Sequence, residues 1–378
     1  MIKKTYRADI DGLRAIAVML VFAKHAMGED LKINGRVGIG IVSIAVATLS
    51  WRFVELPFRL KQRITNRQSW AFLGAALALL GAFVAVILLS DGLSKRFTPK
   101  VAELDRARVR EVVRPECIDF RVPLNDKTAC RIGAQGDPTV MVWGDSHAHA
   151  MLPSFDTAFR SLGVAAWFAT ESGCPPLPLA QVSFRGRDNW RCREHNDKVV
   201  KFIGEHLGLE KIVLVAAWNS YADEAGGYEL STRTSGKSAA ALKKSIEELA
   251  QWQYPDQKSR ELIVISQIPS FEWNVPHKML DRELKGKPIP PLTRQEWLNK
   301  STKSRDVFES LAISKHIILV DSSEWFCNTG TCSYASNNDQ PLYWDGGHIN
   351  AIGAMFITPF LEMEFRQYFL DSEDLKRK

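Results

Sequence analysis

The sequence predicts an α/β domain with a central parallel sheet, preceded by about three transmembrane helices. Short apolar runs rich in β-branched residues alternate with helical patterns in the second half of the chain, which is typical of parallel strands joined by helices. Three longer apolar segments come before them. We therefore divide the chain into a two-helix membrane portion, an anchor helix, a linker and an α/β domain, over residues 1–68, 69–90, 91–136 and 137–378.

The three apolar segments run over 10–27, 37–51 and 70–90, and only the last is a clean span, because about 20 apolar residues are needed to cross a bilayer. Lys and Arg residues lie before the first segment and between the second and third, which places both regions in the cytoplasm. Everything after Asp91 is then on the outer side. A cytosolic protein would have to bury 70–90 as a core helix, which its length and uniform apolarity disfavour.

The charge distribution agrees with this topology. The chain has 378 residues, with 49 Lys and Arg against 43 Asp and Glu. Residues 1–68 hold 12 basic and 5 acidic residues, whereas the rest holds 37 and 38. The basic excess therefore belongs to the membrane portion and is no sign of nucleic-acid binding. The expected partner is a lipid bilayer.

All six cysteines follow the third apolar segment. An even number confined to the exported part predicts disulfides in an oxidising compartment. A zinc site is the alternative, but no C-x-x-C pair has the required spacing, so we predict no metal. Several pairings are possible, and proximity in the sequence favours Cys117–Cys130, Cys174–Cys192 and Cys327–Cys332.

The segment Gly144-Asp145-Ser146-His147 is the first candidate for chemistry. The apolar run 139–143 before it predicts a buried strand, and 148–159 after it predicts a helix. Ser146 then lies at a strand-to-helix corner, where free N–H groups stabilise negative charge. This position suits a serine nucleophile, although serine is also an ordinary helix N-cap residue.

A second candidate segment, Asp345-Gly346-Gly347-His348, lies about two hundred residues later. A serine nucleophile needs a base, and the base needs a group that fixes its tautomer. The paired glycines favour a loop in which Asp345 and His348 meet, ahead of a helix that runs to about Phe369. A glycine turn with a capping aspartate and a surface histidine is the alternative. The presence of both segments favours catalysis.

The two segments resemble the GDSH and D-x-x-H blocks of the SGNH (GDSL-like) esterase and acetyltransferase superfamily. The resemblance covers roughly residues 137–370. It implies a three-layer fold with a central parallel sheet. It also implies that Ser146 is the nucleophile, His348 the general base and Asp345 its orienting acid.

The same resemblance implies an oxyanion hole made of the Ser146 N–H, a glycine and often an asparagine. Gly173 follows the predicted strand 164–169 and fits the glycine position, although it is equally a plain turn glycine before two prolines. Asn219, shortly after the predicted strand 211–216, is the candidate for the amide donor. The neighbouring Trp218 is the alternative occupant of this block, in a structural role.

The membrane portion carries another resemblance. Residues 9–18, with His25 further on, look like the first helix of the integral-membrane acyltransferase-3 family, and 51–59 look like the end of its last core helix. The resemblance implies that Arg14 and His25 handle the acyl group and that acetyl-CoA is the donor. The alternative is that Arg14 snorkels to one interface and His25 lies at the other. A short linker, 27–36, replaces the family's other helices, so no enclosed acyl-CoA pocket is predicted.

We therefore expect a bacterial inner-membrane protein whose periplasmic domain transfers O-acetyl groups to a cell-surface carbohydrate, such as lipopolysaccharide O-antigen or peptidoglycan. No bound cofactor is predicted; the expected partners are the polysaccharide acceptor and a membrane acyl donor. One alternative is a carbohydrate esterase that uses the membrane as an anchor, and another is a non-catalytic remnant. The loop 269–291, with Trp273, is a candidate substrate-facing insertion, and disorder is the alternative. An exposed tryptophan there could stack on a sugar ring, whereas a tryptophan in such a loop more often simply packs.

Overall fold

The computed structural model divides into two units, residues 1–96 and 97–378, which are described separately. It describes most of the second unit and one helix of the first. The described residues are 48, 66–90, 97–109, 114, 117, 124–125, 128–223, 227–232, 238–254, 256–257, 259–327 and 330–369.

In the first unit, helix α4 spans Asn66–Leu89 and covers all but the last residue of the predicted helix 70–90. None of the helices in the described ranges has the length and apolarity required of a membrane span. The two earlier predicted spans, together with Arg14 and His25, lie outside the described residues.

The second unit is built on a six-stranded sheet in the order β1-β3-β2-β6-β8-β9, and every neighbouring pair is parallel except β1 with β3. Five of its strands are parallel, as the sequence predicts for this α/β domain, and the antiparallel edge strand β1 was not anticipated. The strands are Cys130–Gly133 (β1), Val140–Gly144 (β2), Ala165–Thr170 (β3), Lys211–Val215 (β6), Glu261–Ile265 (β8) and Ile318–Val320 (β9).

Two hydrophobic clusters cover the two faces of this sheet. Successive side chains of a strand point to opposite faces, and in β2 Val142 belongs to one cluster while Met141 and Trp143 belong to the other. One face is covered by α7 (Leu152–Leu162) and α15 (Ala351–Phe369). The other is covered by α8 (Trp190–Glu205), α10 (Ala239–Ala250) and α13 (Thr302–Ile313), completing a three-layer α/β fold.

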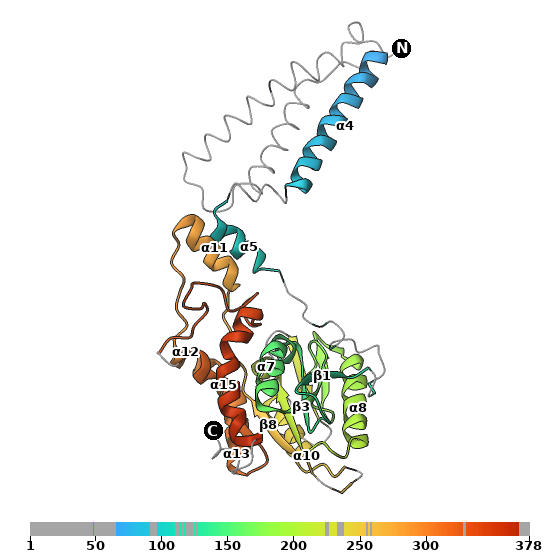
Figure 1. The fold of residues 1–378 in the computed structure, drawn as a ribbon, viewed down its shortest axis with the longest axis vertical. Coiled ribbons are helices and arrows are strands. Elements are labelled where there is room, and N and C mark those ends of the chain that lie inside the picture. The colour runs from blue at the N-terminus through green and yellow to red at the C-terminus, as the bar shows by residue number, and fades with distance from the viewer. Residues whose placement is uncertain are drawn as a thin grey trace, which may run out of the picture. The chain divides into compact units, whose positions relative to one another are not determined.

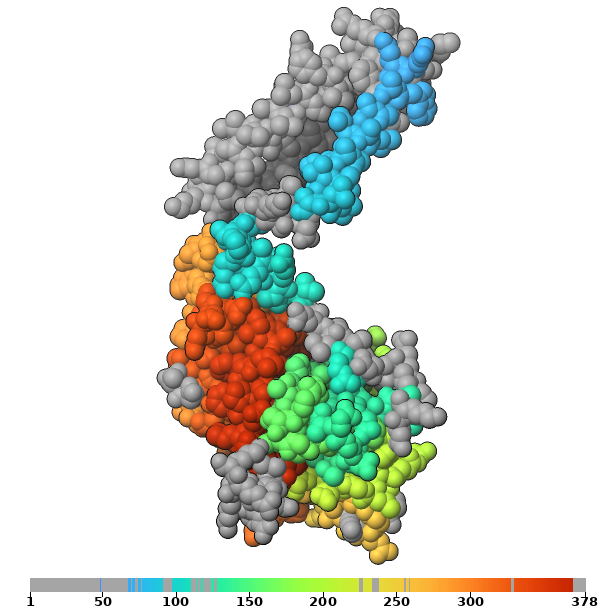
Figure 2. Space-filling model, viewed as in Figure 1, coloured from blue at the N-terminus to red at the C-terminus, as the bar shows by residue number. Residues whose placement is uncertain are grey.

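Helix α15, at the end of the domain, packs on α7 near its beginning. Its Phe365 stacks on Phe159 of α7, with ring centroids 5.3 Å apart, and on Phe155 at 6.1 Å. The two helices lie side by side in Figures 1 and 2. This packing brings the segment before α15 to the sheet edge where the segment after β2 begins.

The helix predicted over 148–159 is divided in two. Helix α6 is a short Ser146–Ala150 segment, and α7 begins at Leu152 with Pro153 in its first turn. Proline is favoured there because its missing N–H is one that a helix start leaves unpaired anyway.

The predicted loop 269–291 contains a helix, α11 (Val275–Lys285), which is capped by Asn274. Its Trp273 is partly buried against Phe271 and Tyr334, so of the two roles considered for a tryptophan in this loop, packing is the one found. Helix α5 (Pro99–Arg106), from the predicted linker, packs on α11.

A second, three-stranded sheet in the order β5-β4-β7 lies beside the main one and was not predicted. Its strands are Gln181–Phe184 (β4), Arg187–Asp188 (β5) and Tyr228–Ser231 (β7). The Cys174–Cys192 disulfide joins the segment before β4 to helix α8, and the other two predicted pairs, Cys117–Cys130 and Cys327–Cys332, are also formed.

Candidate active site

The sheet topology indicates at which edge of the sheet a ligand-binding site is expected. From β2 the chain moves to β3 on one side and later to β6 on the other, so strand order reverses at β2. In open α/β sheets ligands bind outside the carboxyl ends of the strands at such a switch point. Ser146 lies two residues after the end of β2, Gly173 three after β3 and Asn219 four after β6. All three candidates therefore follow neighbouring strand ends.

Ser146 and His348 meet at this edge. The Ser146 Oγ lies 2.8 Å from His348 Nε2, and His348 Nδ1 lies 2.8 Å from Asp345 Oδ2. A carboxylate only accepts hydrogen bonds, so the proton of the neutral imidazole lies on Nδ1 and is donated to Asp345. This leaves the Nε2 lone pair to accept the Ser146 hydroxyl proton. The structure thus brings together all three residues of the predicted relay.

Asp345 is held as the charged acceptor of this relay. Burial would raise its pKa, but hydrogen bonds from the His348 imidazole and from the backbone N–H groups of His348 and Gly347 outweigh that effect, so the pKa lies below its ordinary value. The carboxylate therefore stays ionised at neutral pH. In that form it accepts the Nδ1 proton of His348 and so fixes the imidazole tautomer.

The first glycine of the Asp-Gly-Gly-His segment, Gly346, is required for a steric reason. A Cβ on Gly346 would lie 2.5 Å from the Phe271 carbonyl oxygen and 2.8 Å from that of Trp273. The segments also share two backbone hydrogen bonds, from Phe271 N to Gly346 O and from Val275 N to Asp345 O. The residues just before α11 and at its start therefore hold the Asp345–His348 loop in place.

Asp145, the second residue of the Gly-Asp-Ser-His segment, is fully buried and links the segments that follow β2 and β6. Its carboxylate accepts hydrogen bonds from the His147 N–H at 2.8 Å, the Ala217 N–H at 3.0 Å and the Tyr221 hydroxyl at 2.8 Å. Burial raises its pKa, and these hydrogen bonds oppose the rise. The sequence analysis did not assign this role, although an aspartate between a strand and a helix is a recognisable N-cap signal.

Two aromatic rings flank the His348 imidazole. Trp344 stacks on it with centroids 5.1 Å apart, and His147 packs against it at 4.4 Å. Burial, followed by the charge of His348, lowers the pKa of His147 to about 3, so His147 is neutral at physiological pH. Its Nδ1 is buried with no hydrogen-bond partner. Sequence reasoning missed both rings, because their roles depend on the position of His348.

Three candidate donors for an oxyanion have no hydrogen-bond partner among the described residues: the Ser146 N–H, the Gly173 N–H and the Asn219 Nδ2. The Ser304 hydroxyl donates to Asn219 Oδ1 at 2.5 Å, which fixes the orientation of the amide. The predicted oxyanion-hole residues thus keep their donor groups available. Trp218 beside them is fully buried and its indole N–H donates to Ile265 O at 2.8 Å, which is a structural role.

Gly173 is constrained from two sides. Its φ of +68° lies in the left-handed region, and a Cβ there would come within 2.6 Å of the Tyr228 hydroxyl. Its carbonyl oxygen accepts a hydrogen bond of 3.4 Å from Asn189. Tyr228 therefore borders the candidate oxyanion hole, a contact that the sequence did not indicate because β7 was not predicted.

In the described part of the chain, no cluster of His, Cys, Asp or Glu side chains is arranged to hold a metal ion. The candidate site instead consists of a hydroxyl, a base, an acid and unpaired N–H donors. This arrangement can attack a carbonyl carbon and stabilise the resulting oxyanion.

These observations place the protein in the class of three-layer α/β domains that carry a Ser-His-Asp relay at the carboxyl edge of the sheet. A family model described as "SGNH domain (fused to AT3 domains)" matches residues 116–362, more than half of the sequence. The chain therefore belongs to this family of SGNH domains.

Solved structures of similar fold include the periplasmic domain of a lipopolysaccharide acetyltransferase from Salmonella ser. Paratyphi A (17% identity, 63% of this chain and 85% of that one covered, TM-score 0.45). Another is a carbohydrate acetylesterase family member from Sinorhizobium meliloti (16% identity, 61% and 99% covered, TM-score 0.38). Comparison with curated proteins finds no significant match.

Proposed function

We propose that this chain transfers an acyl group, through an acyl-enzyme on Ser146, to a hydroxyl of a cell-surface carbohydrate. The observation that carries the proposal is the relay of two 2.8 Å contacts from Ser146 through His348 to Asp345, with unpaired N–H donors on the neighbouring strand ends. A Ser-His-Asp relay serves acyl transfer and ester hydrolysis alike. The family's SGNH domains, which occur fused to AT3 domains, support the transfer reaction.

In the first half-reaction, Ser146 Oγ attacks the acyl carbonyl carbon while His348 Nε2 takes the hydroxyl proton. The oxyanion accepts hydrogen bonds from the N–H groups of Ser146 and Gly173 and from the Asn219 amide. The intermediate then collapses, and the leaving group departs with the proton from His348. The product is an ester on Ser146.

In the second half-reaction, an acceptor hydroxyl loses its proton to His348 as its oxygen attacks the Ser146 ester. The new intermediate collapses to release the acylated acceptor, and Ser146 Oγ regains the proton. Water in place of the acceptor would give hydrolysis. The two products therefore differ only in which hydroxyl reaches the acyl-enzyme.

The proposed compartment is the periplasm. Three disulfides in the second unit support an oxidising environment. The excess of basic residues in 1–68 supports attachment to the inner membrane. Acetyl-CoA is the proposed ultimate donor, and because the sequence predicts only two helices in 1–68, a membrane partner is proposed to deliver the acyl group.

The test compares the full-length chain with Ser146→Ala in cells and in detergent. We expect the wild type to form an acyl-enzyme with p-nitrophenyl acetate, seen by intact-protein mass spectrometry, and the variant to form none. We also expect acetylation of the envelope polysaccharide to fall in cells that carry the variant. Equal acetylation in both strains would reject transfer, and an acyl-enzyme on Ser146→Ala would reject the assigned nucleophile.

The second candidate, a carbohydrate esterase, is separated by the same experiment. An esterase predicts that envelope acetylation rises when Ser146 is replaced, because an acetyl-removing activity is lost. Transfer predicts the opposite sign. The non-catalytic alternative predicts no acyl-enzyme in the wild type.

A further inference from the structure

Three side chains of the small sheet form a row that begins beside the candidate oxyanion hole. Tyr228 of β7 and Phe184 of β4 are directly paired across the strands, with ring centroids 4.8 Å apart. The guanidinium carbon of Arg185 lies 5.1 Å from the centre of the Phe184 ring. We call Tyr228, Phe184 and Arg185 the hairpin platform.

The inner end of the hairpin platform is fixed to the site. The Tyr228 hydroxyl fills the space where a Cβ on Gly173 would lie, and the Tyr228 ring meets Tyr221 edge-on at 5.1 Å. Tyr221 in turn donates to buried Asp145. The Tyr228 hydroxyl itself has no hydrogen-bond partner among the described residues, and Tyr228 is only half-buried. A free hydroxyl is therefore held next to the glycine assigned to the oxyanion hole.

The outer end is exposed and shaped by a tight turn. Phe184 is 38% exposed, and Arg185 follows it with φ of +50° before Gly186 at +72°. Two consecutive positive φ values are typical of a two-residue type I′ hairpin turn. Arg185 N donates to the Gly227 carbonyl at 2.7 Å. The turn thus holds a non-glycine residue in a costly conformation and fixes its cation above an aromatic ring.

We propose that the hairpin platform binds a sugar ring of the acceptor chain and presents one of its hydroxyls to the acyl-enzyme. A pyranose ring has an apolar C–H face that matches an exposed aromatic ring, and hydroxyls around its rim that pair with a phenol and a guanidinium. This inference rests on the proposed function, since it names the site at which the acceptor of that reaction is held.

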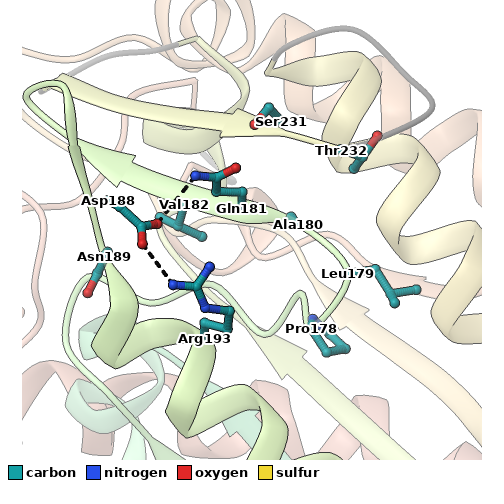
Figure 3. Close-up of a pocket in the computed structure, with 10 residues that line it drawn as sticks. All are labelled: Pro178, Leu179, Ala180, Gln181, Val182, Asp188, Asn189, Arg193, Ser231 and Thr232. Atoms are coloured by element: carbon teal, nitrogen blue, oxygen red, sulfur yellow. Dashed lines mark hydrogen bonds and ion pairs between the residues drawn. The ribbon is translucent and has the colours of Figure 1, made fainter.

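A pocket at the other end of the same hairpin is the competing location. Its volume is about 270 Å³, and its lining includes Asp188, Arg193, Gln181 and Leu179. Figure 3 shows its polar side chains directed at one another: Arg193 pairs with Asp188 at 2.8 Å, and Gln181 donates to Asp188 at 3.5 Å. These groups already satisfy each other. Leu179 on its wall is 37% exposed, nearly the same as Phe184, and so provides a matched control.

Binding is measured first, without turnover, on the full-length chain carrying Ser146→Ala. The probe is envelope polysaccharide of the source organism, freed of O-acyl groups by mild alkali, titrated calorimetrically. We expect Phe184→Ala to weaken binding at least tenfold, and Phe184→Tyr, which keeps the ring, to bind within twofold of the parent. Leu179→Ala should also bind within twofold. Equal weakening by Phe184→Ala and Leu179→Ala, or no binding by the parent, would overturn the proposal.

Reaction partitioning is measured next, with Ser146 restored. We expect Phe184→Ala to lower about tenfold the ratio of acetyl transferred to the same polysaccharide to acetate released from p-nitrophenyl acetate. A parallel fall in both would mean that Phe184 only supports the fold, and would overturn the proposal. A wild type that binds the polysaccharide but releases only acetate would instead reject acyl transfer while upholding the sugar site.

Discussion

The imidazole of His147 packs against the imidazole of His348, with ring centroids 4.4 Å apart and the planes tilted by 37°. The two histidines differ in their proposed roles. In the proposed reaction His348 takes up and releases a proton, whereas His147 is held neutral by burial and by the charge of its neighbour.

Stability should therefore depend on pH through His147. Its pKa falls from the ordinary 6.5 to about 3 on folding, so between these values the unfolded chain binds a proton that the fold excludes. The unfolding free energy should decrease as pH drops from 6.5 towards 3, by at most about 1.4 kcal/mol per pH unit. We expect His147→Phe to reduce this slope; the buried His195, whose pKa burial lowers to about 4, adds a slope of the same sign in both proteins. Urea unfolding at several pH values measures it, and equal slopes in both proteins would contradict the prediction.

Replacing Asp345 by Asn should impair the base without unfolding the loop. The Asn amide would donate to His348 Nδ1 and thereby hold the proton on Nε2, where it cannot accept from Ser146. We expect kcat for p-nitrophenyl acetate to fall on the order of 10³–10⁴-fold with little change in KM. Asp281→Asn is a control, because Asp281 pairs with Lys285 on α11, away from the relay. A loss smaller than tenfold would refute the assigned role.

Asn219 should act as a donor to the oxyanion. Its Oδ1 accepts from Ser304, which leaves Nδ2 for the substrate. Asn219→Ala should lower kcat about 10²–10³-fold. Ser304→Ala leaves the Asn219 amide in place but no longer fixes its orientation. This variant should therefore lower kcat less than Asn219→Ala does. Steady-state rates on p-nitrophenyl acetate test both variants. An Asn219→Ala enzyme with wild-type kcat would show that Asn219 is not part of the oxyanion hole.

The two glycines before His348 should respond differently to alanine. Gly346→Ala would push a Cβ into two backbone carbonyls, which cannot move aside as a side chain can. At Gly347 the nearest atom, on His147, would be 3.7 Å away, an ordinary contact. We expect Gly346→Ala to lose about 1–3 kcal/mol of stability and at least tenfold in activity. Gly347→Ala should retain both, as judged by thermal unfolding and ester hydrolysis.

The Cys174–Cys192 disulfide should matter more than Cys327–Cys332. It closes 18 residues against 5, and loop entropy then predicts contributions of about 3 and about 2 kcal/mol. It also adjoins Gly173, so the Cys174→Ala/Cys192→Ala variant should lose activity as well as stability. Chemical unfolding and hydrolysis rates of the two double variants provide the comparison. Equal effects on activity would argue against a link to the oxyanion loop.

The sequence predicted the parts of this domain that depend on short-range pattern. The buried strands ending at Gly144, Thr170 and Val215 were located to within a residue or two, because short continuous apolar runs have few other stable arrangements. The relay residues were also found, since their types and order limit the chemistry they can perform. The disulfide pairs followed from proximity.

What the sequence did not reveal depends on tertiary contact. The strands of the small sheet are two to four residues long, too short for a periodic signal. Tyr228 is recognisable as part of the site only once β7 places its hydroxyl against Gly173. Asp145 and His147 acquire their roles from burial and from neighbours far along the chain. The helix α11 was missed because Pro276 and the lysines around it resemble loop composition, although proline is favoured in a helix's first turn.

The relay joins a hydroxyl near the start of the domain to a base just before its last helix, 202 residues later. During biosynthesis the nucleophile is therefore made long before the group that activates it. On the proposed mechanism, a chain that stops before His348 has Ser146 but no base to activate it. The proposed relay therefore forms only when the whole domain, with α15 docked on α7, is complete.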